Sequence, residues 1–363
     1  MALSASAALR SVNTSHLGAW SDAKMGVEHS GADPSFRTPG AEGGSARVGR
    51  ARRLVSAAVF AVAVWLVWRQ VSAMSLSGFL GALAATPAWA VLLSVAFTAA
   101  SYACLSGTEW LALQALGHDL SFRRAAAVAV PAYAVTNSAG FSPATGAIFR
   151  AKLYGRDGLS AGQGAAVSLV AGLAVTLSGL VTAGLVMLLA PAAFGAALRG
   201  PAWAPPLVGA ALALPGVLWF YAFTPKAPAW LGGGRTSLRR SKRALGLSVG
   251  LGDWLFSSAA LFILLPGSDL AVFPTFLAAY VAGSLLSAAT GVPGGIGVFE
   301  AIVLALSAVF AQVHETAAAL LLYRCVYSLG PLAIWGGVVL IRTWRRRRSR
   351  RTPPAATNRG GRR

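Results

Sequence analysis

Acidic residues, histidines and cysteines are scarce in this sequence. Of 363 residues, 11 are Asp or Glu, 4 are His and 2 are Cys, and charged residues make up 12% of the chain, against roughly 25% in an average soluble domain. Cys104 and Cys325 both lie in apolar stretches, and two such residues provide neither a disulfide framework nor a metal site. Metalloprotease and Walker A motifs are also missing. We therefore expect no cofactor and no soluble-enzyme active site.

Apolar residues are abundant instead, at 56% of the chain. Several apolar runs reach or approach the length of about 20 residues that crosses a bilayer. These runs are 54–68, 87–107, 161–191, 203–224, 245–266 and 317–341. The sequence therefore predicts an all-α polytopic membrane protein with about six transmembrane helices.

The net charge of +20 is concentrated at the two ends of the chain, where 17 of the 31 basic residues precede Leu54 or follow Ile341. Basic residues beside membrane spans typically mark the cytoplasmic side and an anionic lipid surface, so we expect both termini in the cytoplasm and no nucleic-acid partner. We predict a disordered leader (1–53), a membrane domain (54–343) and a basic cytoplasmic tail (344–363). The preference for Arg over Lys favours a GC-rich bacterial genome, and hence a bacterial plasma membrane.

Two apolar stretches are interrupted by Gly and Pro. Residues 125–149 have basic residues at both ends, so both ends should be cytoplasmic, and a re-entrant hairpin satisfies this; a single helix kinked at Pro143 is the alternative. Residues 270–312 should begin and end outside, because the span 245–266 leads outward and the last span, 317–341, must end inside at its arginine-rich tail. The sequence GVPGG lies between the two apolar arms of this stretch. The prediction is a second re-entrant hairpin from the opposite face, and eight apolar segments in all.

The two interrupted stretches resemble each other. PATGAIFRA (143–151) aligns with PGGIGVFEA (293–301), and Arg150 coincides with Glu300. Paired Gly/Pro-interrupted segments in the two halves of a chain are typical of transporters with inverted repeats, and they indicate the binding site. We therefore predict an inverted repeat.

A broken helix inside a membrane requires protein or a wet cavity around its exposed backbone. A helix that restarts after the break directs free N–H groups and a positive dipole end forward, which suits a phosphate. The alternative is that these glycines only permit close helix packing. A dinucleotide-binding loop is excluded, because GGIGVFE lacks the strand that such a loop follows.

Charged residues inside apolar runs strengthen the functional interpretation, since each one is costly in a membrane without a partner. Arg150, Asp253, Glu300 and Arg324 are of this kind, and Glu300 and Arg324 can pair with each other. Tyr323 and Tyr327 flank Arg324 one helical turn apart, although an interfacial aromatic belt explains the tyrosines equally well. Our candidate substrate-binding residues are Asn137, Pro143, Gly146, Arg150, Pro293, Gly294, Gly295, Gly297, Glu300, Tyr323, Arg324 and Tyr327.

Three segments together, SPATGAIFRAKLYGRDGLS, GVPGGIGVFEA and YRCVYSLGPL, resemble the lysylphosphatidylglycerol synthase transmembrane region, a family of flippase-like membrane proteins. The resemblance covers about 54–343. In fused members of the family this region precedes an aminoacyl-transferase domain and is held to move aminoacylated phosphatidylglycerol across the bilayer. This chain resembles the stand-alone members.

The resulting functional prediction is a lipid translocase for an anionic or aminoacylated phospholipid, or a related lipid phosphate. Its expected partners are membrane phospholipids, and a homodimer and a separate lipid-modifying synthase are both compatible with the sequence. The alternative is a membrane-embedded transferase acting on polyprenyl-phosphate substrates, but its acids should cluster at one membrane face, whereas the seven within 54–341 are scattered. A membrane adaptor would leave Glu300 and Arg324 unexplained.

Overall fold

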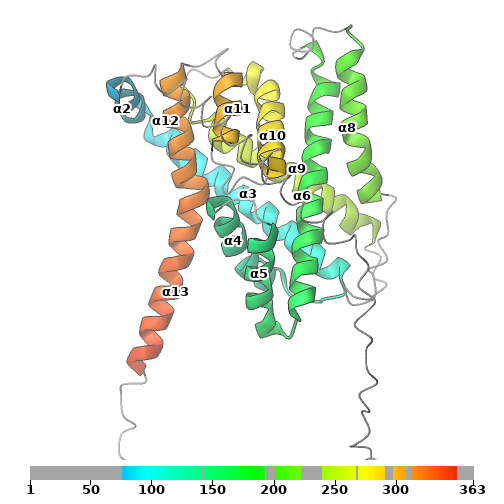
Figure 1. The fold of residues 1–363 in the computed structure, drawn as a ribbon, viewed down its shortest axis with the longest axis vertical. Helices are drawn as coiled ribbons and strands as arrows, with labels where there is room; N and C mark the ends of the chain where they lie inside the picture. Colours follow the sequence, from blue (N-terminus) through cyan, green and yellow to red (C-terminus); the bar gives the residue numbers. More distant parts are fainter. Residues whose placement is uncertain are drawn as a thin grey trace, which may run out of the picture. The chain divides into compact units, whose positions relative to one another are not determined.

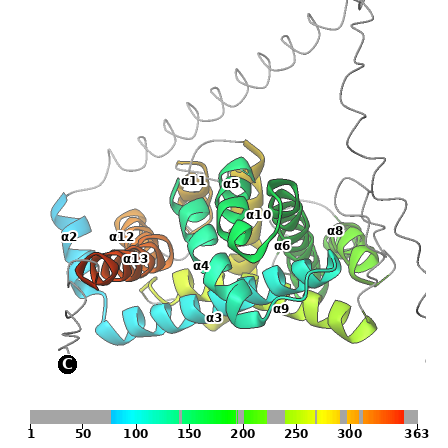
Figure 2. The same ribbon diagram turned by 90° about the horizontal axis from the view of Figure 1, so that it is seen from below.

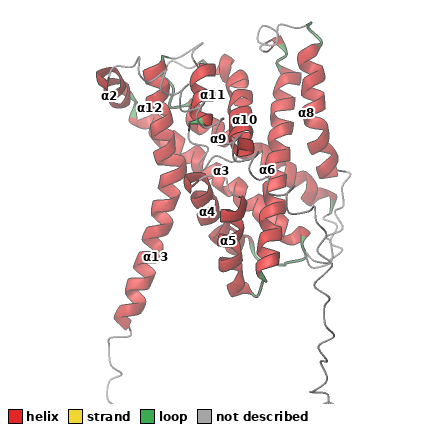
Figure 3. Cartoon of the chain, viewed as in Figure 1, coloured by secondary structure: helices red, strands yellow, loops and turns green. Residues whose placement is uncertain are grey.

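The computed structural model describes residues 76–139, 143–192, 194, 201–221, 239–266, 269–290, 297–307 and 312–349. The described part of the chain is helical and contains no strand, as Figure 3 shows. Its elements are α2 (Leu76–Ala85), α3 (Ala88–Ala115), α4 (Phe122–Ala139), α5 (Pro143–Tyr154), η2 (Gly155–Asp157), α6 (Ala161–Leu189), α8 (Ala204–Tyr221), α9 (Arg240–Phe262), η4 (Leu270–Val272), α10 (Phe273–Thr290), α11 (Val298–Ser307), α12 (Val313–Tyr323), η6 (Arg324–Leu329) and α13 (Gly330–Ser349).

Within the described residues, six helical segments are long and apolar enough to cross a membrane, which confirms the prediction of a polytopic membrane protein. They are Ala88–Ala115, Ala161–Leu189, Ala204–Tyr221, Arg240–Phe262, Leu270–Thr290 and Val313–Arg342. Five of them coincide with expected spans. The sixth, Leu270–Thr290, was expected as one arm of a hairpin, and the expected span 54–68 lies outside the described residues. A short apolar helix, α2, precedes the first of these six segments.

Helices α4 and α5 fold back on each other as a helical hairpin. Helix α5 begins at Pro143, a residue that suits the first helical position because it has no N–H to leave unpaired. Arg124 at the start of α4 donates hydrogen bonds to Asp157, just after α5, with Nη2 2.7 Å from Oδ2. This contact brings the two ends of the segment together, as the hairpin prediction requires; insertion of the hairpin into the membrane from one side stays a prediction.

Helices α10 and α11 also pack against each other, but they differ in length. The 21 residues of Leu270–Thr290 extend about 32 Å, enough to cross the hydrocarbon core. The 10 residues of α11 extend only about 15 Å. The second interrupted segment therefore combines one membrane-length helix with a short one, and the break between them lies outside the described residues.

The interrupted helices lie between the long helices. In Figures 1 and 2, α4, α5, α10 and α11 are flanked by α12 and α13 on one side and by α6 and α8 on the other, and α3 and α9 cross beneath them. Helices α3 and α9 contact each other extensively, and α6 contacts both α5 and α10. This arrangement brings residues from both interrupted segments close to η6.

Small residues allow the long helices to approach closely. A methyl group added to Gly209 of α8 would lie 2.7 Å from the carbonyl oxygen of Gly184 on α6, and one added to Gly250 of α9 would lie 2.5 Å from Cβ of Ser178 on α6. Such contacts are typical of membrane helices, where packing replaces the hydrophobic effect as the force that joins helices.

Candidate functional site

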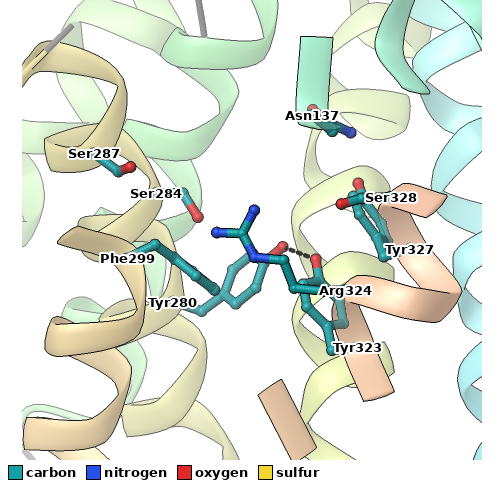
Figure 4. A pocket seen from close by; sticks show the side chains of 9 residues that line it. All are labelled: Asn137, Tyr280, Ser284, Ser287, Phe299, Tyr323, Arg324, Tyr327 and Ser328. Atoms are coloured by element: carbon teal, nitrogen blue, oxygen red, sulfur yellow. Dashed lines mark hydrogen bonds between the residues drawn. The ribbon is translucent and has the colours of Figure 1, made fainter. Parts of the chain in front are cut away.

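A small polar cavity of about 100 Å³ lies between α10, α11 and η6. Figure 4 shows the guanidinium group of Arg324 projecting into this cavity. The other lining residues are hydroxyl, amide and aromatic side chains: Asn137, Tyr280, Ser284, Ser287, Phe299, Tyr323, Tyr327 and Ser328. The described lining therefore offers one cation and several neutral hydrogen-bonding groups among membrane-spanning helices.

Helix α10 contributes one side of the cavity through Tyr280, Ser284 and Ser287. These residues follow the spacing i, i+4, i+7, which places them on one face of a helix. The opposite side comes from η6, and Asn137, near the end of α4, completes the lining. The first hairpin thus contributes one residue to a cavity built mainly from the second half of the chain.

Arg324 is held by Glu300 of α11. Arg324 Nε lies 2.7 Å from Glu300 Oε1, and Nη2 contacts the same oxygen. The two side chains are 25% and 18% exposed, so the pair is reachable from the cavity and yet shielded. The pairing suggested by the sequence is therefore present, although Glu300 is not among the residues that line the cavity.

The second carboxylate oxygen of Glu300 stabilises the start of its own helix. The backbone N–H of Gly297 donates to Glu300 Oε2 at 2.8 Å, and the Gly297 carbonyl accepts from Ala301 N–H at 2.9 Å. Glu300 is the third residue of α11, where a carboxylate commonly reaches back to the N-cap N–H. Gly297 has φ of 88°, a conformation that favours glycine. The glycine next to the break thus has a structural reason: it lets Glu300 cap α11 while holding Arg324.

Helix α12 continues into a six-residue π-helical segment, η6, which carries Arg324 and Tyr327. Short π segments occur frequently at functional sites. Here Tyr323 and Tyr327 stack, with ring centroids 5.0 Å apart, and the Tyr323 and Tyr280 hydroxyls lie 2.5 Å apart. Tyr323 and Tyr327 are buried, so they form an ordered wall beside Arg324 rather than an interfacial belt.

Behind this wall lies a buried carboxylate, Asp253 of α9, which is 5% exposed. The Ser101 hydroxyl donates to Asp253 Oδ1 at 2.5 Å, and the Tyr327 hydroxyl lies 2.9 Å from Ser101 Oγ. Because the single hydroxyl hydrogen of Ser101 is used in the bond to Asp253, Tyr327 is the donor in the second bond. A hydrogen-bonded chain therefore connects Asp253 to a residue that lines the cavity.

Tyr102 links the first hairpin to η6. Its hydroxyl donates to the backbone carbonyl of Tyr327 at 3.0 Å and accepts from the Asn137 side-chain amide at 3.5 Å. These bonds fix the position of Asn137 beside the cavity.

Arg150 lies in a second cluster, in which Arg150, Glu109 and Tyr154 are buried. Its Nε donates to both oxygens of Glu109, at 2.7 and 2.9 Å, and Nη1 donates to Ser168 at 3.3 Å. The Tyr154 hydroxyl donates to Glu109 at 3.0 Å, and the Tyr133 ring lies 4.7 Å from the guanidinium carbon. This cluster joins α3, α4, α5 and α6 and places no residue in the lining of the polar cavity.

The structure therefore distributes the predicted site residues over two places. Asn137, Tyr323, Arg324 and Tyr327 line the polar cavity, and Glu300 and Gly297 connect to it through Arg324. Arg150 belongs to the buried cluster, where a methyl on Gly146 would lie 2.9 Å from Arg150 Nη1. Pro143 begins α5. Pro293, Gly294 and Gly295 lie outside the described residues.

Several lining residues were not predicted. Tyr280, Ser284 and Ser287 carried a detectable signal, a polar stripe at helical spacing in an apolar run. Phe299 and Ser328 are direct neighbours of the predicted residues Glu300 and Tyr327. Within the described residues no group of three or more His, Cys, Asp or Glu side chains could hold a metal ion.

A comparison with protein-family models places the chain in a family. Residues 54–347 match the model of the lysylphosphatidylglycerol synthase transmembrane region. The chain belongs to this family. A curated relative, an uncharacterized protein of Synechocystis sp., is 29% identical over 236 residues, which is 64% of this chain and 73% of the relative. Membership of this family links the membrane domain to lipid handling.

Proposed function

We propose that this lysylphosphatidylglycerol synthase-like membrane protein moves an anionic or aminoacylated phospholipid, or a related lipid phosphate, from one leaflet to the other, and does no covalent chemistry. The polar cavity with Arg324 at its centre carries this proposal. An arginine in a membrane-spanning helix normally serves a substrate pathway or a partner. A guanidinium presents five N–H donors in a fork that matches phosphate oxygens, so Arg324 has donors left for a headgroup while it remains bound to Glu300.

The pairing with Glu300 supports a zwitterionic or aminoacylated headgroup in particular. When the headgroup phosphate binds Arg324, Glu300 loses part of its partner, and an amine on the same headgroup can compensate for this loss. With the phosphate beside Arg324 and the amine beside Glu300, two ion pairs take the place of one, so no charge is left unpaired in a site of low dielectric constant. A headgroup with phosphate alone would leave Glu300 without full compensation, unless the carboxylate takes up a proton.

The transferase alternative has weaker support from the cavity. Among the described residues its lining contains hydroxyl, amide, aromatic and guanidinium groups and no carboxylate, whereas phosphoryl or glycosyl transfer by this route would require a carboxylate base. Glu300, the carboxylate that contacts Arg324, already accepts hydrogen bonds from Arg324 and Gly297.

We propose a bacterial plasma membrane from the preference for Arg over Lys, and cytoplasmic termini from the basic residues at both ends of the chain. An aminoacylated substrate would come from a separate lipid-modifying synthase.

The test uses purified protein in liposomes that contain fluorescent phosphatidylglycerol, lysyl-phosphatidylglycerol or phosphatidylcholine. We expect Arg324→Ala to reduce movement of the first two lipids most strongly, and Glu300→Gln to impair movement of lysyl-phosphatidylglycerol while expression and folding stay close to wild type. Ser248→Ala, an exposed change on α9 whose hydroxyl bonds only within its own helix, is the control. Normal movement by both Arg324→Ala and Glu300→Gln, or movement that ignores headgroup charge, would refute the proposal.

A further inference from the structure

A second, much larger hollow lies on the other side of η6. It has a volume of about 680 Å³ and is bounded by α3, α4, η6 and α13. Its wall is mainly aliphatic and aromatic, with Val95 on α3, Val130 on α4, and Ile334, Trp335 and Val338 on α13. We call this hollow the apolar groove.

The composition of the wall determines what can occupy the groove. An apolar cavity with few polar partners does not hold water favourably. Ile334 and Val338 are exposed, so this part of the wall is open to the surroundings of α13. Around a membrane-spanning helix these surroundings are lipid chains, and a hydrocarbon chain is the chemical match for the wall.

One end of the groove is basic. Arg342, the lining residue furthest along α13, is exposed. Ala127 lines the groove from α4, and Arg123 lies one helical turn earlier on the same face. Among the described residues neither arginine forms an ion pair with an acidic side chain. Arg342 in the lining and Arg123 one turn before the lining part of α4 are guanidinium groups without an acidic partner in the described part of the chain, and they are complementary to an anionic headgroup attached to a hydrocarbon chain.

We propose that the apolar groove is a binding site for one acyl chain of an anionic phospholipid, whose headgroup phosphate is held by Arg342 and Arg123. The site is distinct from the polar cavity, because η6 separates the two. Tyr323, Arg324, Tyr327 and Ser328 line the cavity, whereas Cys325 and Val326 line the groove.

This position gives the groove a role in the transport cycle. An acyl chain in the groove contacts η6, the π-helical segment that carries Arg324. Arrival or departure of that chain therefore changes the packing of the segment whose Arg324 would bind the headgroup of the transported lipid in the polar cavity. The inference rests on the proposed function for that role, but binding in the groove is measurable without any lipid movement.

The native cysteines provide a direct test. Cys325 lines the groove and is exposed, whereas Cys104 lies on α3 outside the lining. In a Cys104→Ala background, purified full-length protein in dodecyl maltoside is labelled with N-ethylmaleimide while dioleoyl-phosphatidylglycerol, dioleoyl-phosphatidylcholine or glycerol 3-phosphate is added. We expect phosphatidylglycerol to slow the labelling of Cys325 several-fold, phosphatidylcholine to slow it less, and glycerol 3-phosphate to have no effect.

Two pairs of variants assign the contacts. Arg342→Gln should raise the amount of phosphatidylglycerol needed for protection, whereas Arg240→Gln, an exposed arginine at the start of α9, should not. Val338→Trp, which fills the groove, should remove the dependence of labelling on lipid; Leu207→Trp, on the exposed surface of α8, should retain it. Size-exclusion profiles verify that each variant is folded.

Labelling that responds to no lipid would overturn the site, and equal protection by both lipids with no effect of Arg342→Gln would overturn the role of the two arginines. Protection by glycerol 3-phosphate would show a phosphate site without a chain and would also refute the proposal. If phosphatidylglycerol protects Cys325 but the protein moves no lipid in liposomes, the proposed function alone is refuted.

Discussion

Arg150 and Glu109 form a buried ion pair, with Arg150 Nε 2.7 Å from Glu109 Oε1 and side chains that are 5% and 0% exposed. The pair connects α5 of the first hairpin to α3, and Tyr154 adds a hydrogen bond to the carboxylate. Arg150 and Glu300, which align in the two interrupted segments, are thus each paired with a residue of opposite charge on a longer helix.

We expect Glu109→Gln to destabilise the protein by about 3–5 kcal/mol, because it leaves the Arg150 guanidinium buried without a counter-charge. The midpoint of thermal unfolding in detergent measures the effect. Asp157→Asn, which removes the partly exposed pair with Arg124, is the control and should cost about 1 kcal/mol or less. Equal losses in the two variants would contradict the structural role of the buried pair.

The close approach of α6 and α8 predicts a strong dependence on side-chain size at Gly209. Gly209→Ala should lower stability by about 1–3 kcal/mol, since its methyl group would meet the Gly184 carbonyl and Met187. Gly172→Ala, on α6 with no atom within 4 Å of the added methyl, should be neutral or slightly stabilising because alanine favours helix. Unfolding midpoints that fall equally for both variants would argue against this packing.

The hydrogen-bonded chain behind the tyrosine wall can be broken at Ser101. Ser101→Ala removes the donor to Asp253 and the acceptor for Tyr327, and leaving such buried groups unpaired costs about 1–3 kcal/mol. Asp253→Asn keeps an oxygen that can accept from Ser101 and should cost less. The comparison uses denaturation in detergent, and the reverse order of the two variants would disprove the assignment.

The first hairpin predicts that Asp119 and Arg156 lie on the same side of the membrane. Both residues lie outside the helices of membrane-crossing length, and both are exposed. Cysteines introduced at these two positions, in a background without Cys104 and Cys325, should both react with an impermeant maleimide in inside-out vesicles. Reaction of one from inside-out vesicles and of the other from right-side-out vesicles would eliminate the hairpin.

The sequence was most informative about breaks and intramembrane charges. Pro143 begins α5 as expected, because proline and glycine act locally on the backbone. The Glu300–Arg324 pair was predictable, because each charge needs a partner in the membrane and few candidates were close in the sequence.

Other features depend on contacts between distant segments. Glu109 follows the expected span 87–107 in the sequence, yet it is fully buried, because α5 folds back over α3 and supplies Arg150. The π-helical segment η6 has no counterpart in the hydrophobic pattern, since it shifts the helical period by a single residue. Leu270–Thr290 was assigned to a hairpin arm because the charge rule counts crossings and does not measure helix length.

The ion pair between Glu300 and Arg324 also bears on the membrane potential. Moving one elementary charge through 100 mV costs about 2.3 kcal/mol, whereas this pair sums to zero net charge. When both side chains move together the electric field therefore does no net work on them. In the proposed transport cycle an empty site would therefore change its orientation without drawing on the voltage, and only a lipid that carries net charge would make the cycle electrogenic.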